Sequence, residues 1–131
     1  IIFVYPWTGR PGHANPPDWD KIPGAHGSTP EAQGFEALID QYKARGIQIV
    51  GLSTQSREWQ REFAARIGLT YPLMSDSELK VADALQLPRF QTGGVAYLKR
   101  LTLMCREGLI VRAFYPVCAP DRHAADLLAM L

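Results

Sequence analysis

The residues best placed to do chemistry lie where a loop meets a helix, with Ser28 following Gly27 and preceding Thr29. The order Ser28-Thr29-Pro30-Glu31 is typical of a helix start, with a hydroxyl, a proline in the first turn and an acid three residues after Ser28. Backbone N–H groups in the first turn lack partners, and the helix dipole adds partial positive charge there. A thiolate would therefore be stabilised at position 28, whereas a neutral serine hydroxyl ionises too weakly to be activated there.

The elements around this junction are predicted to be strands alternating with helices. Residues 1–5 form a continuous apolar run, typical of a strand buried on both faces. Residues 6–27 are rich in Pro, Gly and Asp and predict a long loop. Loops of this length are usually functional or disordered. A second strand is expected over residues 47–52, and a hairpin over residues 95–104 and 109–115. The pattern predicts an α/β fold with a mixed central sheet flanked by helices.

Apolar residues at helical spacing predict one helix that starts at Ser28 and ends at Gly46. Three more helices are expected, through residues 59–67, 78–85 and 122–131. Because the chain opens on a strand of the central kind, we expect an N-terminal segment of the full protein to be absent from this sequence.

Composition excludes several classes of function. The chain has 131 residues, 47% of them apolar, which predicts one domain over residues 1–131. A net charge of +1 favours neither nucleic acid nor a membrane surface as partner. Two cysteines are too few for a disulfide scaffold, so a cytoplasmic location is expected. The three histidines have no Cys or His partner at ligand spacing, which argues against a metal site.

Five segments resemble, in order, the landmarks of the peroxiredoxins, and in particular of their bacterioferritin-comigratory or Q-type branch. They are FVYP at residues 3–6, GSTPE at 27–31, IVGLS at 49–53, YPLMSD at 71–76, and RLTL with REG within 100–108. The resemblance spans nearly the whole chain. It implies a thioredoxin-like fold with a long loop insertion before the first helix.

The resemblance also implies a thiol-dependent peroxidase. In that family a cysteine thiolate attacks the O–O bond of hydrogen peroxide or a small alkyl hydroperoxide, and a thioredoxin-like protein reduces the resulting sulfenic acid. By position, Ser28 takes the place of this cysteine, and Arg100 that of the arginine that keeps it ionised. Pro6 matches the proline that opens the family motif P-x-x-x-T/S-x-x-C and excludes water. Main-chain N–H groups near Gly27 to Thr29 would bind the peroxide oxygens. No metal or organic cofactor is implied.

The sequence departs from the family motif in several places. Residues 7–26 contain an insertion, and Ala25 stands where the motif has a hydroxyl, which leaves Thr8 as an uncertain substitute. Some Q-type relatives carry a resolving cysteine five residues after the first, where this chain has Gln33. Cys118, in a predicted loop, is then the candidate resolving thiol, with a one-cysteine mechanism as the alternative. Cys105, at the end of a predicted strand, is expected to be buried.

Serine at position 28 cannot form a sulfenic acid, so this chain is expected to be inert toward peroxide. We interpret Ser28 as an engineered replacement of the catalytic cysteine. The alternative is a native serine that only caps the helix. Arg100 would then be a solvated strand residue. A native serine would fit a non-catalytic thioredoxin-fold interaction domain. In either case Trp7 and Trp19 are expected to cover the pocket or to contact the second subunit of a homodimer. A serine hydrolase would need a base beside Ser28 and glycine in place of Pro30.

Overall fold

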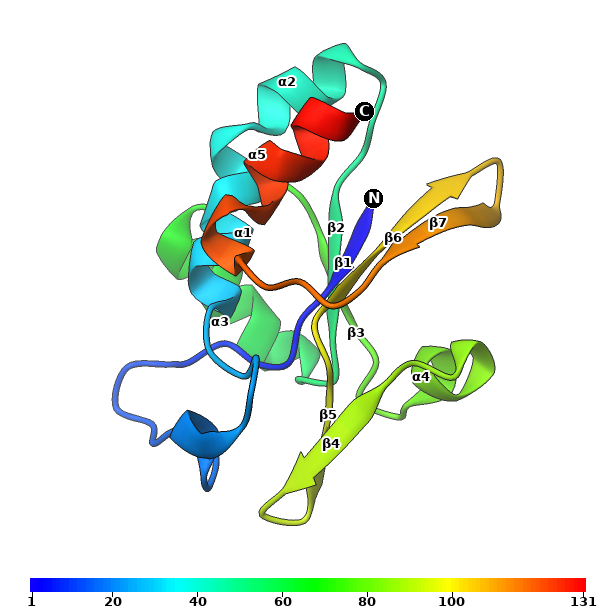
Figure 1. Ribbon diagram of the computed structural model, residues 1–131. Coiled ribbons are helices and arrows are strands. Elements are labelled where there is room, and N and C mark those ends of the chain that lie inside the picture. The colour runs from blue at the N-terminus through cyan, green and yellow to red at the C-terminus, as the bar shows by residue number, and fades with distance from the viewer.

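The computed structural model describes all residues, 1–131, and is built around a five-stranded mixed sheet in the order β3-β2-β1-β6-β7 (Figure 1). The strands are β1 (Ile2–Val4), β2 (Val50–Ser53), β3 (Leu73–Ser75), β6 (Leu101–Arg106) and β7 (Leu109–Phe114). The three strands β1, β2 and β3 run parallel, while β6 is antiparallel to β1 and β7 is antiparallel to β6. The opening strand is therefore central, as its unbroken apolar pattern predicts.

Helices cover both faces of this sheet (Figure 1). On one face the helices are α1 (Ser28–Ala37), α2 (Ile39–Ala44), α3 (Arg57–Ile67) and α5 (Pro120–Met130), and on the other face is α4 (Lys80–Leu85). Side chains of β1 alternate between the two faces, so Phe3 packs in the core with Phe35 of α1. The next residue, Val4, packs with Leu52 and Leu101 in a second core on the α4 side. The two cores fix the position of β1 and of the loop that follows it.

A separate two-stranded sheet, β4 (Arg89–Thr92) and β5 (Val95–Leu98), supports the long loop. The loop contains one short 3₁₀ turn, η1 (Trp19–Lys21), in which Trp19 is buried against Tyr97 of β5 with ring centroids 5.2 Å apart. The loop is therefore packed against the body of the domain along part of its length.

The predicted α/β fold with a mixed sheet is confirmed, but three local predictions are wrong. The expected single helix is two, because Leu38 leaves helical geometry at φ −109° and ψ 10° and ends α1 before α2 begins. The expected strand over residues 95–104 is interrupted at Lys99 and Arg100, between β5 and β6. Cys105 is exposed, because it lies on the part of the β6–β7 hairpin that projects beyond the helices (Figure 1). None of the helices is long and apolar enough to cross a membrane.

Candidate active site

Ser28 is the first residue of α1 and is 4% exposed. It does not cap the helix as its hydroxyl predicts: Gly27 is the N-cap residue, no side chain caps this end, and the Ser28 hydroxyl has no hydrogen-bond partner. Gly27 is required here on two grounds, because its φ is +113° and a Cβ would lie 2.5 Å from Cγ of Pro120. The start of α1 is thus held directly against the start of α5.

Arg100 lies in the connection between β5 and β6 and is buried, not solvated. Its Nη1 donates to Oε1 of Glu31 at 2.9 Å, and the two side chains are 3% and 0% exposed. Glu31 is one helical turn after Ser28, so a guanidinium from a distant part of the sequence reaches the first turns of α1. The structure therefore brings Arg100 and the Ser28 end of the helix together.

The same guanidinium also holds the end of the long loop. Its Nη2 lies 3.2 Å from the carbonyl oxygen of Gly24, 3.3 Å from that of Ala25 and 3.1 Å from that of His26. These three residues come just before Gly27, so Arg100 fixes the chain that leads into the helix. Removing the guanidinium would free both the loop end and the Glu31 carboxylate.

The Glu31 carboxyl is electrostatically unusual. Burial raises the pKa of Glu31 to about 7, and the nearby charge and hydrogen bond of Arg100 act in the opposite direction. Glu31 therefore gains or loses its proton near neutral pH, next to the first turn of α1. Glu31 can hold Arg100 as a carboxylate, and it can carry a proton at slightly lower pH.

Three buried polar side-chain atoms in the chain lack a hydrogen-bond partner, and all three belong to this cluster. They are Oγ of Ser28, Oε2 of Glu31 and Nε of Arg100. Buried polar atoms are nearly always paired in folded proteins, so unpaired ones call for an explanation such as a bound ligand. Together they offer a hydroxyl, an acceptor and a cationic N–H donor, a set suited to a small polar molecule.

Thr8 does not direct its hydroxyl to Ser28. Its backbone N–H and its hydroxyl both donate to Oε1 of Gln55, at 3.0 and 3.1 Å. Its carbonyl oxygen accepts from Nε2 of Gln55 at 3.0 Å and from Nε1 of Trp59 at 2.7 Å. The loop is thus clamped where it leaves β1, just after the fully buried Pro6.

A cavity of about 340 Å³ adjoins the start of α1. Ser28 and Thr29 line it on the helix side, and Trp7 and Trp19 line it on the loop side. Arg100 lines a second, larger groove of about 880 Å³, together with Cys118. His26 lines both spaces, so the loop end that Arg100 holds forms the wall between them.

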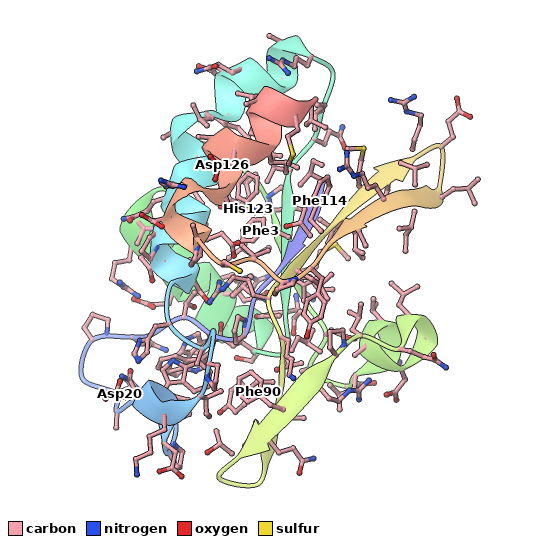
Figure 2. The ribbon with its side chains drawn as sticks, viewed as in Figure 1. Phe3, Asp20, Phe90, Phe114, His123 and Asp126 are labelled. Carbon is pink, nitrogen blue, oxygen red and sulfur yellow. The ribbon has the colours of Figure 1, made fainter.

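A second buried polar pair lies beside this cluster. Figure 2 shows His123 on the face of α5 that is turned to the sheet, and its Nε2 lies 2.8 Å from the hydroxyl oxygen of Thr102 on β6. Burial lowers the pKa of His123; Asp126 acts against this shift and the charge of Arg100 reinforces it. His123 therefore favours its neutral form next to the Arg100 cluster.

Sequence reasoning missed two residues of this arrangement, Glu31 and Gln55. Glu31 was assigned only to a capping motif, although its i+3 spacing from Ser28 places both side chains on one side of a helix. Gln55 carries no such signal, because only the folded chain brings it to the loop. No group of three or more His, Cys, Asp and Glu side chains is arranged to hold a metal ion.

Comparisons with known sequences indicate the family of this chain. The AhpC/TSA family model matches residues 23–117. Peroxiredoxin Bcp of Xanthomonas campestris pv. campestris is 30% identical in an alignment that covers 100% of this chain and 74% of that protein. Chloroplastic peroxiredoxin Q of Sedum lineare is 25% identical, over 100% of this chain and 62% of that protein.

The fold of this chain is similar to that of solved peroxiredoxin-type structures. The bacterioferritin comigratory protein of Xanthomonas campestris superposes with a TM-score of 0.75 at 27% identity, covering 98% of this chain and 74% of that one. The peroxidoxin BcpB of Mycobacterium tuberculosis gives 0.76 at 25% identity, over 98% and 74%. The fold is therefore thioredoxin-like, and the chain belongs to the AhpC/TSA family of peroxiredoxins, with its similarity to the Bcp and peroxiredoxin Q branch running along its whole length.

Proposed function

We propose that this chain carries the peroxide site of a thiol peroxidase with serine at the position of the nucleophile. As it stands it is inert toward peroxide, and with cysteine at position 28 it becomes a peroxidase. The observation that carries the proposal is the cluster of unpaired buried atoms on Ser28, Glu31 and Arg100 at the first turns of α1. Ser28 and Glu31 belong to the first turns of α1, and Arg100 is bonded to Glu31, so all three side chains lie near the place where a thiolate at position 28 would stand.

The reaction at a cysteine in position 28 is a nucleophilic displacement. The thiolate sulfur attacks the terminal peroxide oxygen, which stays on the sulfur as the sulfenic hydroxyl. The O–O bond breaks, and the other oxygen takes a proton from solvent and leaves as water or an alcohol. The sulfur is oxidised to a sulfenic acid and the peroxide is reduced. Free N–H groups in the first turn of α1 stabilise the thiolate before the attack.

Arg100 orients this site in two ways. Through Glu31 and the carbonyl groups of residues 24–26 it positions both sides of residue 28. Its positive charge, close to the first turns of α1, helps to keep the thiolate ionised and to orient the peroxide. Pro6, buried at the end of β1, helps exclude water.

Hydrogen peroxide and small alkyl hydroperoxides are the proposed substrates, because the cavity at Ser28 is about 340 Å³ and has tryptophan walls. A thioredoxin-like protein is the proposed reductant. Cys118 is the proposed resolving thiol: it attacks the sulfenic sulfur at position 28, water leaves, and a disulfide remains. If Cys118 takes no part, the external thiol attacks the sulfenic acid directly.

The Ser28→Cys variant tests the proposal, made in a background with Cys105→Ser and Cys118→Ser so that it holds one thiol. Ser56→Cys is the matched control, because Ser56 also stands at a helix start but is exposed, as is the neighbouring Arg57. We expect the first variant to consume one equivalent of peroxide and to form a sulfenic acid trapped by dimedone, far faster than the second. Equal rates in the two variants would reject the proposal.

A non-catalytic interaction domain with a native Ser28 is the second candidate. It is favoured by one observation: position 33, like position 28, lacks the cysteine of some Q-type relatives and holds Gln33. Codon 28 of the natural gene discriminates between the candidates. A cysteine codon supports a replaced nucleophile, whereas a serine codon together with an unreactive Ser28→Cys variant supports the interaction domain.

A further inference from the structure

The cavity at Ser28 has a second space on the other side of its tryptophan wall. This second space is a slot of about 190 Å³ beside the start of α3. Its apolar walls are Trp7, Trp59, Val95 and Tyr97, and none of its lining side chains carries a charge. Trp7 is the one residue that lines both the slot and the cavity of about 340 Å³ at Ser28. The indole of Trp7 therefore separates two spaces.

The ring of Trp7 is held from both sides. On the cavity side its centroid lies 5.5 Å from that of Trp19, and on the slot side 6.0 Å from that of Trp59. The loop backbone also passes close to it, since a Cβ at Gly9 would lie 3.6 Å from Cζ3 of Trp7. The next residue, Thr8, is fixed by hydrogen bonds of its backbone N–H and its hydroxyl. The indole thus has a defined position in the wall.

The rest of the wall is built from rings of the core. Trp19 is 4% exposed and packs against Tyr97, whose ring centroid lies 5.2 Å away. Phe90 stacks on Tyr97 at 5.6 Å. The long loop and the β4–β5 hairpin, which carry these rings, lie at the same end of the molecule (Figure 1). Trp7 is only partly buried, so it is the part of the wall that a substitution can remove with the least damage to the core.

We propose that Trp7 sets the upper size limit for a hydroperoxide that reaches residue 28. Its part in peroxide selection rests on the proposed function and concerns the same site. Ser28 and Thr29 line the cavity on the helix side, with Trp7 and Trp19 on the loop side. When the –OOH group of a hydroperoxide is at residue 28, the rest of the molecule lies between the helix start and the indole of Trp7. A small alkyl group fits there, whereas a phenyl group meets the indole.

A shorter side chain at position 7 joins the slot to the cavity. The phenyl group of cumene hydroperoxide then enters the uncharged space between Trp59, Val95 and Tyr97, while its –OOH group stays at residue 28. The reaction is unchanged: the O–O bond breaks, the terminal oxygen stays on the sulfur, and the other oxygen leaves as the alcohol. The fit of one small apolar group changes selectivity by about 10- to 200-fold in an apolar pocket. We therefore expect removal of the indole to raise the relative rate of the bulky substrate at least about tenfold.

The test uses Ser28→Cys with Cys105→Ser and Cys118→Ser, so that position 28 holds the single thiol, and adds Trp7→Ala. Loss of the thiol is followed with hydrogen peroxide and with cumene hydroperoxide, by quenching in denaturant with N-ethylmaleimide and by mass spectrometry of the intact chain. The readout is the rate constant with cumene hydroperoxide divided by that with hydrogen peroxide. This ratio cancels any change in the reactivity of the thiol itself. We expect it to rise about tenfold or more in Trp7→Ala, and to rise less, in the same direction, in Trp7→Leu.

Val95→Ala is the control variant, because Val95 lines the slot but not the cavity and is 50% exposed. It enlarges the slot and leaves the indole of Trp7 in place, so we expect the ratio to stay as it was. An unchanged or lower ratio in both Trp7 variants, or an equal rise in Val95→Ala, would overturn the proposal.

The same variants are also alkylated with iodoacetamide and with N-benzyl-iodoacetamide, two reagents that differ by a phenyl-bearing group and involve no peroxide chemistry. We expect the relative rate of the benzyl reagent to rise in the two Trp7 variants alone. This ratio decides whether Trp7 limits access to residue 28 even if the chain proves to be no peroxidase. The two proposals can therefore fail separately.

Discussion

The Arg100–Glu31 pair allows a sharp test of how burial sets the contribution of an ion pair to the free energy of unfolding. A second pair, Arg89 with Asp83, has the same 2.9 Å distance between nitrogen and oxygen. The difference is exposure: 3% and 0% for the first pair, against 30% and 70% for the second. Arg100→Gln leaves a buried carboxylate without its partner and should cost about 3–5 kcal/mol of unfolding free energy. Arg89→Gln should cost no more than about 1 kcal/mol.

The loss of unfolding free energy caused by Arg100→Gln should also depend on pH. The pKa of Glu31 is raised to about 7 in the folded chain, from 4.5 as the ordinary value, and Arg100 acts to lower it. Without Arg100 the folded pKa rises further. A carboxyl with a raised folded pKa loses stability as pH rises from its unfolded pKa up to its folded one. The variant therefore continues to lose stability well above pH 7, where the loss in the unmodified chain levels off.

Urea unfolding at pH 5 and pH 8.5 measures both effects from the midpoint and slope. We expect Arg100→Gln to be more destabilised at pH 8.5 than at pH 5, and Arg89→Gln to be nearly unchanged at both. Equal losses in the two variants, or a deficit of Arg100→Gln that shrinks as pH rises, would refute the reasoning.

Three further predictions concern the same region. Glu31→Gln should abolish the loss of stability that this carboxyl imposes as pH rises from 4.5 to 7, seen as a flatter pH dependence of the urea midpoint. Gly27→Ala should cost at least about 2 kcal/mol in the same assay, since it adds strain at φ +113° and a clash with Pro120; an unchanged midpoint would contradict the close approach. Trp59→Phe should lower the free energy of unfolding by about 1 kcal/mol, measured by thermal unfolding. It removes the hydrogen bond from Nε1 of Trp59 to the Thr8 carbonyl oxygen, which also accepts from Gln55.

Periodicity and turn residues were enough to predict the architecture. The unbroken apolar run at residues 1–5 predicted a central strand, and the order Ser28-Thr29-Pro30-Glu31 predicted a helix start within one residue of where α1 begins. The role of Ser28 within that start was wrong, since the hydroxyl caps nothing. Capping depends on the geometry of the residue before the helix, and a glycine with positive φ took that place.

The surroundings of Arg100 could not be predicted as well. The sequence suggested one long strand through residues 95–104, and the β4 strand was overlooked although Gly93 and Gly94 form a typical hairpin turn with positive φ. This hairpin ends β5 early, so Arg100 falls in a connection and turns inward. Its partners, Glu31 and three loop carbonyls, are about 70 residues away in sequence, beyond the reach of any local pattern.

The clamps on the long loop have a consequence for what the loop can carry. One end is fixed by the bonds between Thr8 and Gln55, and the other by the bonds from Arg100 to the carbonyls of residues 24–26. Residues 11–14 between them are exposed and do not line the cavity at Ser28. Because the entropy cost of closing a loop grows only slowly with its length, peptides can be grafted at this tip while residue 28 keeps its place. The domain thus offers an attachment point, for an affinity tag or an epitope, that is mechanically isolated from its chemistry.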